Sequence, residues 1–306
     1  MTDKKKHYHL RKPVKIAIPI ITILIASLLI LLLSNNSQSF TSEVSNESVF
    51  ASIKDSSEDL SNSPYIKNLS DDLDDLKRDN TIIYYANKFK LNVPRALEIA
   101  HQITNNYDDP YFLENHVIAP EWMRGKIGTF NSEEAGIIYF IRNMFSYPEW
   151  YGSSIEEMRL SEVPDTNRIE VNGKFIMDNG LTFEQYVGQM ADAFGIDKAL
   201  ALGIIYQESG YMRSVLASTK NNVSGMRNYD GWASYPTLEA GVMAHIVNLR
   251  SIIRQYELDL ANDPNAIYVL SGVYVNGNAS SPAYTWVEKV QIFQRQINES
   301  DLFIVK

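Results

Sequence analysis

Cysteine is absent from the 306-residue chain. Its absence excludes a disulfide framework, a thiolate zinc site, a cysteine nucleophile and a lipid-modified cysteine anchor. Histidine is scarce as well, with five residues and neither an HExxH motif nor another metal-ligand spacing. The sequence also lacks a GxSxG motif and a P-loop, which argues against serine hydrolysis on an α/β-hydrolase fold and against nucleotide turnover. We therefore expect neither a metal nor another cofactor.

Charged residues are missing from the stretch 16–33, IAIPIITILIASLLILLL. These 18 residues approach the roughly 20 that an α-helix needs to span the hydrocarbon core of a membrane. Six lysines or arginines within residues 1–15 predict a cytoplasmic N-terminus, with the rest of the chain outside the cell. A cleaved signal peptide is the alternative, but its apolar region usually has about 7 to 15 residues, and no small-x-small site follows Leu33. We therefore expect a single-pass membrane anchor.

The charge of the chain is distributed unevenly. The net charge is −9, and residues 1–15 contribute +5, so the remainder carries −14. Nucleic acids would repel such an acidic body, which argues against nucleic-acid binding. Residues 34–64 are rich in Ser, Asn, Asp and Glu and poor in apolar residues. This composition predicts a flexible linker with a reach on the order of 30 Å.

Helical patterns predominate in residues 65–175, which we interpret as a helical accessory region. The acidic run Ser70–Leu76 lacks the glycine and the terminal glutamate of a calcium-binding EF-hand loop. It predicts instead the acidic first turn of a helix. Apolar periodicity predicts further helices over 81–89, 94–104 and 132–145.

Aromatic residues gather in the loop 147–152, and Trp122 precedes them. Sugar rings have flat apolar faces that stack on aromatic side chains, so these residues are candidates to line a glycan groove. The alternative is that they fill the junction between two halves of the protein. Asn172-Gly173 then predicts a hairpin turn that marks a boundary near residue 175.

Residues 176–306 again show helical patterns, and the whole chain is predicted to be mainly α, a helical bundle with one small irregular or β-like lobe. Thr182 and Gln185 form a capping box. Asp197 can cap a helix that Gly210 ends in a left-handed conformation. The other helix starts predicted in this region are Thr237, Asp263-Pro264 and Ser281-Pro282.

Glu208 is the candidate catalytic residue that the helical pattern singles out. It falls in the last turn of the helix expected over residues 198–209, where the helix macrodipole disfavours a carboxylate. Ala201 and Ile204 lie on the same face and give it apolar neighbours. Both effects raise a pKa, and a glycosidase needs a carboxyl group that stays protonated near neutral pH as its general acid. The alternative is a solvated glutamate at a helix end.

Three motifs within residues 181–298 carry a family resemblance. They are Gln207 to Tyr211 (QESGY); Lys220 to Arg227 (KNNVSGMR) followed by Tyr235 to Glu239 (YPTLE); and Val273 to Val275 with Pro282 to Tyr284 and Lys289-Val290. In this order and spacing they resemble motifs of the glucosaminidase domains of glycoside hydrolase family 73, in the lysozyme-like superfamily.

This resemblance implies a lysozyme-like helical domain over residues 176–306 that cleaves β-1,4 bonds at N-acetylglucosamine in peptidoglycan strands. It implies that Glu208 is the catalytic acid and that Tyr284 lines the cleavage subsite. Together with the anchor it implies an enzyme on the outer face of the cell membrane, facing the cell wall. The accessory region, 65–175, is a candidate surface for glycan or for a membrane-protein partner. The further positions expected to contact substrate are Tyr211, Asn221, Asn222, Gly225, Trp232, Tyr235 and Tyr274.

A second catalytic carboxylate is harder to find, because no Asp or Glu lies between Ser209 and Tyr229, where several members carry one. Of the remaining local acids, Glu239 and Glu288 are expected on helices, and Asp230, in the loop, is the best candidate for a catalytic assistant. A substrate-assisted mechanism, with the 2-acetamido group of the sugar as nucleophile, needs no second carboxylate. The alternatives are a lytic transglycosylase, which gives anhydro sugar ends, and a non-catalytic glycan-binding or partner-binding ectodomain.

Overall fold

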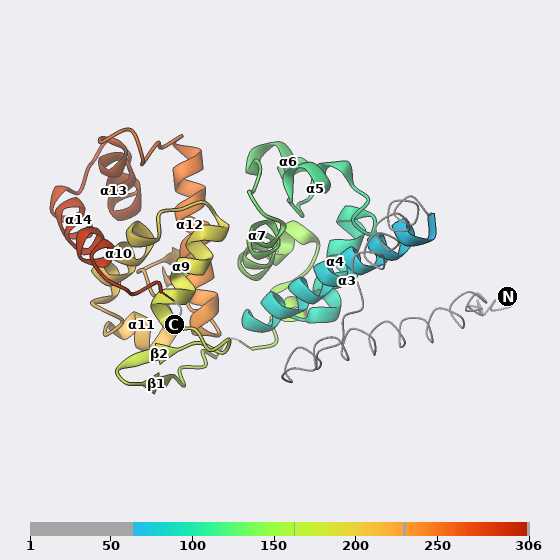
Figure 1. Cartoon of the computed structure of the whole chain (residues 1–306), viewed down its shortest axis with the longest axis horizontal. Coiled ribbons are helices and arrows are strands. Elements are labelled where there is room, and N and C mark those ends of the chain that lie inside the picture. Colours follow the sequence, from blue (N-terminus) through green and yellow to red (C-terminus); the bar gives the residue numbers. More distant parts are fainter. Residues whose placement is uncertain (1–63, 162, 229–230, 305–306) are drawn as a thin grey trace, which may run out of the picture. The chain divides into compact units, whose positions relative to one another are not determined.

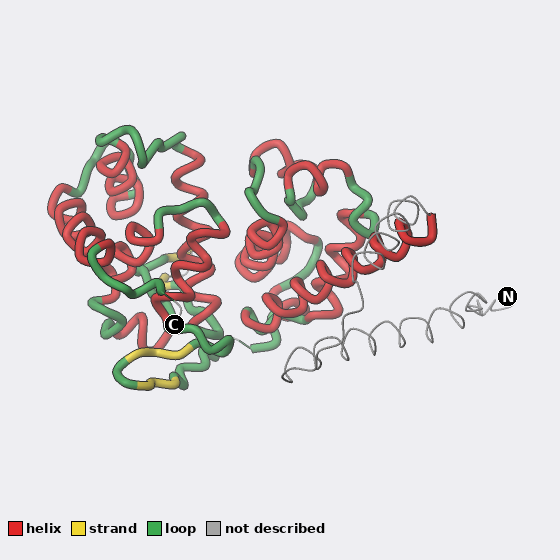
Figure 2. Tube along the Cα trace, in the orientation of Figure 1, coloured by secondary structure: helices red, strands yellow, loops and turns green. Residues whose placement is uncertain are grey.

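The computed structural model describes residues 64–161, 163–228 and 231–304, with the backbone alone for residues 64–71. In this part of the chain α-helices predominate beside two short antiparallel strand pairs, so the mainly α prediction is confirmed (Figure 1, Figure 2). The predicted membrane anchor, 16–33, and all but the last residue of the predicted linker lie outside the described residues. Among the helices that the structure does describe, none combines the length and the apolar character needed to cross a membrane.

The first group of elements is helical. Its longest member, α3, begins at Pro64, a residue suited to the first turn of a helix. The acidic run Ser70–Leu76 therefore lies inside α3 and not in a first turn, so that prediction was wrong in position. The elements of this group are α3 (Pro64–Lys88), α4 (Val93–Thr104), α5 (Pro110–Asn115), α6 (Glu121–Ile127), α7 (Glu133–Ser146), the 3-10 helix η1 (Pro148–Tyr151) and α8 (Ile155–Met158).

The second group of elements starts with the predicted hairpin. Asn172 and Gly173 both have positive φ values, 53° and 75°, as the turn between its two strands requires. Thr182 caps the next helix through a capping box with Gln185, as predicted. The elements are β1 (Ile169–Val171), β2 (Lys174–Ile176), α9 (Phe183–Ala193), α10 (Lys198–Ser209), α11 (Val215–Lys220), β3 (Arg227–Asn228), β4 (Gly231–Trp232), α12 (Leu238–Gln255), α13 (Ala266–Asn276) and α14 (Tyr284–Asn298).

Two predicted helix starts were wrong by two or three residues. The Asp263 carboxylate accepts a hydrogen bond from the Asn265 N–H at 2.8 Å, which forms a turn before α13. Before α14, the Ser281 carbonyl accepts from the Asn276 amide at 2.7 Å, so this residue is held by α13 and does not cap α14. In both segments these hydrogen bonds hold the chain in a turn, and the helix begins only after that turn.

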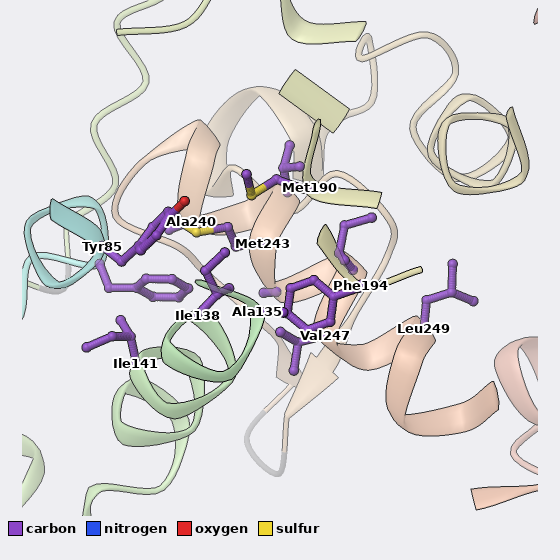
Figure 3. Close-up of a cluster of buried hydrophobic side chains, with 14 of the residues drawn as sticks. Tyr85, Ala135, Ile138, Ile141, Met190, Phe194, Ala240, Met243, Val247 and Leu249 are labelled. Carbon is purple, nitrogen blue, oxygen red and sulfur yellow. The ribbon is translucent and has the colours of Figure 1, made fainter. Parts of the chain in front are cut away.

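Residues Asn68–Lys306 form one compact unit with a shared hydrophobic core. Helices from both predicted regions, 65–175 and 176–306, contribute to it, so each covers apolar surface of the other. The functional division at residue 175 stays a prediction. Figure 3 shows part of this core, with side chains of α3, α7, α9 and α12 including Tyr85, Ala135, Ile138, Met190, Met243 and Val247.

Candidate active site

Glu208 occupies the position that the helical pattern predicted. Asp197 caps α10 by accepting a hydrogen bond from the Leu200 N–H at 2.6 Å, and Gly210 ends the helix with φ 55° and ψ 54°. Glu208 therefore lies in the last turn, where backbone carbonyl groups face it and their dipoles disfavour a negative charge. Its neighbours one turn back are fully buried and apolar.

The carboxyl group of Glu208 is half-buried and has one strong hydrogen-bond donor. Oε1 accepts from the indole Nε1–H of Trp286 at 2.6 Å. Burial raises the pKa of Glu208, and the hydrogen bond from Trp286 offsets part of that rise because it stabilises the carboxylate. Within the described residues, no lysine, arginine or histidine forms an ion pair with this group. The site thus favours a carboxyl group that holds its proton and can deliver it.

Trp286 was missed by sequence reasoning. It lies in the first turn of α14, which packs along α10. One chemical signal could have pointed to it. A buried indole N–H usually finds a hydrogen-bond partner, and α10 carries one acid near its end, Glu208. That Trp286 pairs with Glu208 depends on how α14 packs against α10, which the sequence pattern does not show.

A cavity of about 710 Å³ opens beside the Glu208 carboxyl group, within the range of small-ligand sites. Among the described residues that line it, Glu208 is the sole carboxylate. The structure brings Glu208 together there with four residues that were predicted to contact substrate, Gly225, Trp232, Tyr235 and Tyr274. The other lining residues include Arg142, Ser224, Met226, Arg227, Asn248 and Ile252.

Gly225 lies directly against the carboxyl group. Its φ is +65°, and a Cβ atom at this position would come within 3.2 Å of Glu208 Oε2. Glycine therefore satisfies two needs here, since it adopts the left-handed backbone and leaves room for the acid. The loop that contains Gly225 leads into β3, and Arg227 of β3 and Trp232 of β4 line the same cavity.

Asn221 and Asn222 were predicted to bind substrate, but both are buried and use their side chains to hold this loop. The Asn221 amide donates to the carbonyls of Asp165 and Tyr235, at 2.9 and 3.1 Å. The Asn222 amide donates to the carbonyls of Met226 and Ala233, at 2.7 and 3.0 Å, and its Oδ1 accepts from the Met226 N–H at 2.9 Å. These residues fix the backbone beside Gly225 and do not present their side chains to the cavity.

The other predicted site residues do not line the cavity around Glu208. Tyr211 is half-exposed and packs against Tyr206 and Phe293, with ring centroids 4.7 and 5.3 Å apart, beside a different, smaller cavity. Tyr284 is 66% exposed at the start of α14, where its ring lies 5.5 Å from that of Tyr268. Asp230 lies outside the described residues.

Glu239 and Glu288, the two other acids considered from the sequence, both lie on helices as expected. Glu239 is in the first turn of α12, where Oε1 accepts from the Asp178 N–H at 3.1 Å and lies 3.9 Å from the Lys88 ammonium. Glu288 is exposed on α14. Neither lines the Glu208 cavity.

Tyr274 is the wall residue with the most defined polar setting. Its hydroxyl lies 3.1 Å from the Ser224 carbonyl and 3.3 Å from Nδ1 of His245. Burial lowers the pKa of His245 to about 4, so the ring is neutral and Nδ1 can accept while Nε2–H faces the Ala201 carbonyl at 3.3 Å. Burial also raises the pKa of Tyr274, so its hydroxyl keeps its proton. This chain of contacts fixes the tyrosine between the Gly225 loop and α12.

The helices before residue 175 also reach the cavity, through Arg142 of α7. Its guanidinium lies 5.8 Å from the ring centroid of Tyr147, and Tyr147 stacks on Trp150 at 4.1 Å. Trp122 meets Trp150 edge-on at 5.9 Å and is 56% exposed. The aromatic loop predicted from sequence is thus a partly exposed cluster connected to the cavity wall by Arg142.

Comparison with protein families gives one match. Residues 184–299 match the family model described as Glucosaminidase, Mannosyl-glycoprotein endo-beta-N-acetylglucosaminidase. The matched segment contains Glu208, the Gly225 loop, Tyr274 and Trp286, whereas Arg142 and the aromatic cluster precede it. Searches among curated proteins and among solved structures returned no match.

Proposed function

Since residues 184–299 form an N-acetylglucosaminidase domain of glycoside hydrolase family 73, we propose that the chain is a peptidoglycan hydrolase. In this proposal it cuts β-1,4 bonds of the glycan strand at N-acetylglucosamine, with Glu208 as general acid. The observation that carries it is the Glu208 carboxyl group, half-buried at the edge of a 710 Å³ cavity, with Trp286 as its donor and a pKa raised by burial.

Glu208 would donate its proton to the oxygen of the leaving sugar as the glycosidic bond breaks. The resulting positive charge on the other sugar needs a partner, and Glu208 is the sole carboxylate among the described lining residues. We propose that the 2-acetamido group of the bound sugar attacks the anomeric carbon, and that water then opens the intermediate with Glu208 as base. Asp230 stays a candidate to orient that acetamido group, and Tyr284 a candidate substrate contact.

A lytic transglycosylase is the second candidate, favoured by the same lone carboxylate. In that reaction Glu208 first protonates the leaving oxygen and then accepts the proton of a hydroxyl of the same sugar, which closes an anhydro ring. No water is added to the product. The two mechanisms therefore share their acid and differ in the nucleophile.

We further propose that the chain acts at the outer face of the cell membrane. The support is the uncharged stretch 16–33 preceded by six basic residues, with a polar linker after it. This arrangement would hold the catalytic unit close to the membrane and within reach of the inner layers of the cell wall.

Mass spectrometry of digested peptidoglycan tests the reaction. We expect new reducing N-acetylglucosamine ends, because water completes the proposed reaction. Products that carry only anhydro ends, lighter by one water, would replace hydrolysis with transglycosylation. If the purified chain binds strands without shortening them, the enzymatic proposal fails in favour of a binding ectodomain.

Trp286→Phe tests how the general acid is tuned. Its indole N–H stabilises the carboxylate of Glu208, so removal of the donor should raise the pKa of this group further. The rate falls when the acid loses its proton, and we expect the alkaline limb of the kcat/KM profile to move to higher pH. Trp232→Phe is the matched control, because this indole lines the cavity without a hydrogen bond to Glu208. An unmoved limb in Trp286→Phe, or a shift to lower pH, would contradict this assignment.

A further inference from the structure

A second cavity, of about 400 Å³, adjoins the catalytic one along the contact between α7 and α12. On α7, Arg142 lines the catalytic cavity and Tyr139, three residues earlier, lines the second. On α12, Asn248 lines the first and Ser251, three residues later, lines the second. Residues three apart are neighbours on a helix surface, so the linings of the two cavities adjoin on both helices.

The second cavity is built around the guanidinium of Arg254. This group lies against Gly128, the residue that ends α6 with φ +76°, and a Cβ atom at Gly128 would overlap it. Nη1 of Arg254 is buried and has no hydrogen-bond partner in the described structure. A buried donor without a partner costs stability, more so when it carries charge, and its retention points to a ligand that satisfies it.

Two further arginines line these cavities without an ion pair among the described residues. Arg250 lines the same cavity, and burial together with the like charge of Arg254 lowers the pKa of Arg250. Glu257 is present in the lining, yet among the described residues it forms no ion pair with either arginine. In the catalytic cavity, Nη1 of Arg142 donates to Asn143 Oδ1 at 2.9 Å, but Nε of the same guanidinium is buried without a hydrogen bond. An acidic protein thus places one of these arginines in the cavity of its catalytic acid and two in the second cavity, none with an ion-pair partner among the described residues.

A single guanidinium group recognises planar oxyanions, above all carboxylates, through two parallel hydrogen bonds. The sugars of a peptidoglycan strand are uncharged, but the peptide stems that hang from alternate sugars end in carboxylates. A stem attached next to the bond being cut could reach beyond the catalytic cavity, and the second cavity, with Arg250 and Arg254 in its lining, adjoins it. A carboxylate satisfies buried guanidinium donors better than an uncharged sugar oxygen does, because hydrogen bonds between ionised groups are stronger.

We propose that Arg250 and Arg254 bind a carboxylate of the peptide stem on the strand being cut, so that the protein prefers peptide-bearing glycan to uncharged glycan. This inference rests on the proposed peptidoglycan substrate. Arg142, which lines the catalytic cavity three residues after Tyr139 of the second cavity, would contact the same stem closer to the sugar. The helices before residue 175 then supply the wall of the second cavity that faces these arginines of α12, through residues that include Lys126, Phe130 and Tyr139.

The test compares two substrates that differ in charge alone, peptide-bearing strands and the same strands with their carboxylates converted to methylamides. For the unaltered protein we expect the KM on the amidated strands to be roughly tenfold higher, with kcat little changed. Arg250→Gln and Arg254→Gln should raise the KM on peptide-bearing strands to the same level and leave the KM on amidated strands as it was. Arg295→Gln, an exposed residue of α14, removes the same charge elsewhere and should behave like the unaltered protein.

Several outcomes would overturn the proposal. Equal losses on both substrates would show that the arginines act on the fold. Arg254→Lys keeps the charge but loses the second parallel hydrogen bond, so we expect it to restore only part of the preference for peptide-bearing strands. Full restoration by lysine would contradict bidentate binding of a carboxylate. An unaltered protein that cuts both substrates equally well would also exclude stem recognition. Competition by inorganic phosphate without any effect of amidation would assign the pocket to phosphate polymers instead. If the unaltered protein cut neither substrate, the proposed function itself would be refuted. This result differs from cutting both substrates equally well, which would refute stem recognition alone.

Discussion

Glu208→Gln is expected to lower the rate of glycan cleavage by at least the roughly 10² to 10⁴-fold typical of a lost general acid. The amide has nearly the same shape as the acid and its oxygen can still accept the Trp286 hydrogen bond, but it has no proton to give to the leaving sugar. Release of soluble fragments and of new reducing ends from peptidoglycan measures the loss. Glu288→Gln, at an exposed position of α14, removes the same charge and should retain full activity.

The same substitution should have the opposite effect on stability. Because burial raises the pKa of Glu208, the folded state binds its proton more tightly than the unfolded state does. The contribution of this group to stability is therefore present at low pH and declines as the pH rises from the ordinary glutamate value, near 4.5, through the folded value. Glu208→Gln removes that decline. Its melting temperature should match that of the unaltered protein in acid and exceed it at neutral and alkaline pH.

Retention of normal cleavage by Glu208→Gln would exclude its role as the acid. If Glu208→Gln and the unaltered protein had equal melting temperatures at all pH values, the ionised Glu208 would not destabilise the folded state. Asp230→Asn in the same assays distinguishes a mechanism with the acetamido group alone from one that needs Asp230 as a second carboxylate. Full activity is expected if the acetamido group alone serves as nucleophile, and a loss comparable to that of Glu208→Gln would make Asp230 the missing carboxylate.

Much of the local structure could be predicted because its causes lie within a few residues. Asp197 and Gly210 define the two ends of α10 through one side-chain hydrogen bond and one left-handed residue. Asn172-Gly173 forms the hairpin turn through its two positive φ values. The same local reasoning misplaced the start of α14, because Ser281 is held by a side chain from α13. No local pattern contains that contact.

The candidate site likewise has features that the sequence predicted and features that depend on packing. The placement of Glu208 in a last helical turn was visible in the sequence, whereas its donor Trp286 is 78 residues away and required the packing of α14 on α10. Arg142 reaches the cavity from a region outside the matched family segment. The motif also drew attention to Asn221 and Asn222, but a motif does not distinguish amides that face a ligand from amides that hold a loop.

Gly225→Ala is the second substitution with a large expected effect, because it changes the setting of the acid without touching the acid itself. Alanine at φ +65° costs about 1 to 2 kcal/mol of backbone strain. Its Cβ would also lie 3.2 Å from Glu208 Oε2, closer than an ordinary van der Waals contact, so the loop or the carboxyl group must move by a few tenths of an ångström. Asn221 and Asn222 hold the loop rigidly, so we expect the carboxyl group to move.

Because a displacement of about 1 Å can cost 10²-fold in rate, we expect Gly225→Ala to lower kcat by roughly 10- to 100-fold, with a smaller change in KM. Gly173→Ala is the matched control. Its φ is +75° but its Cβ would meet no atom within 4 Å, so it shares the backbone strain without crowding the acid. Both variants should lose similar stability in urea denaturation, and Gly225→Ala alone should lose activity. If the two lose activity equally, strain and not the position of Glu208 accounts for the effect. If Gly225→Ala keeps its kcat, the acid tolerates displacement and the close contact has no catalytic role.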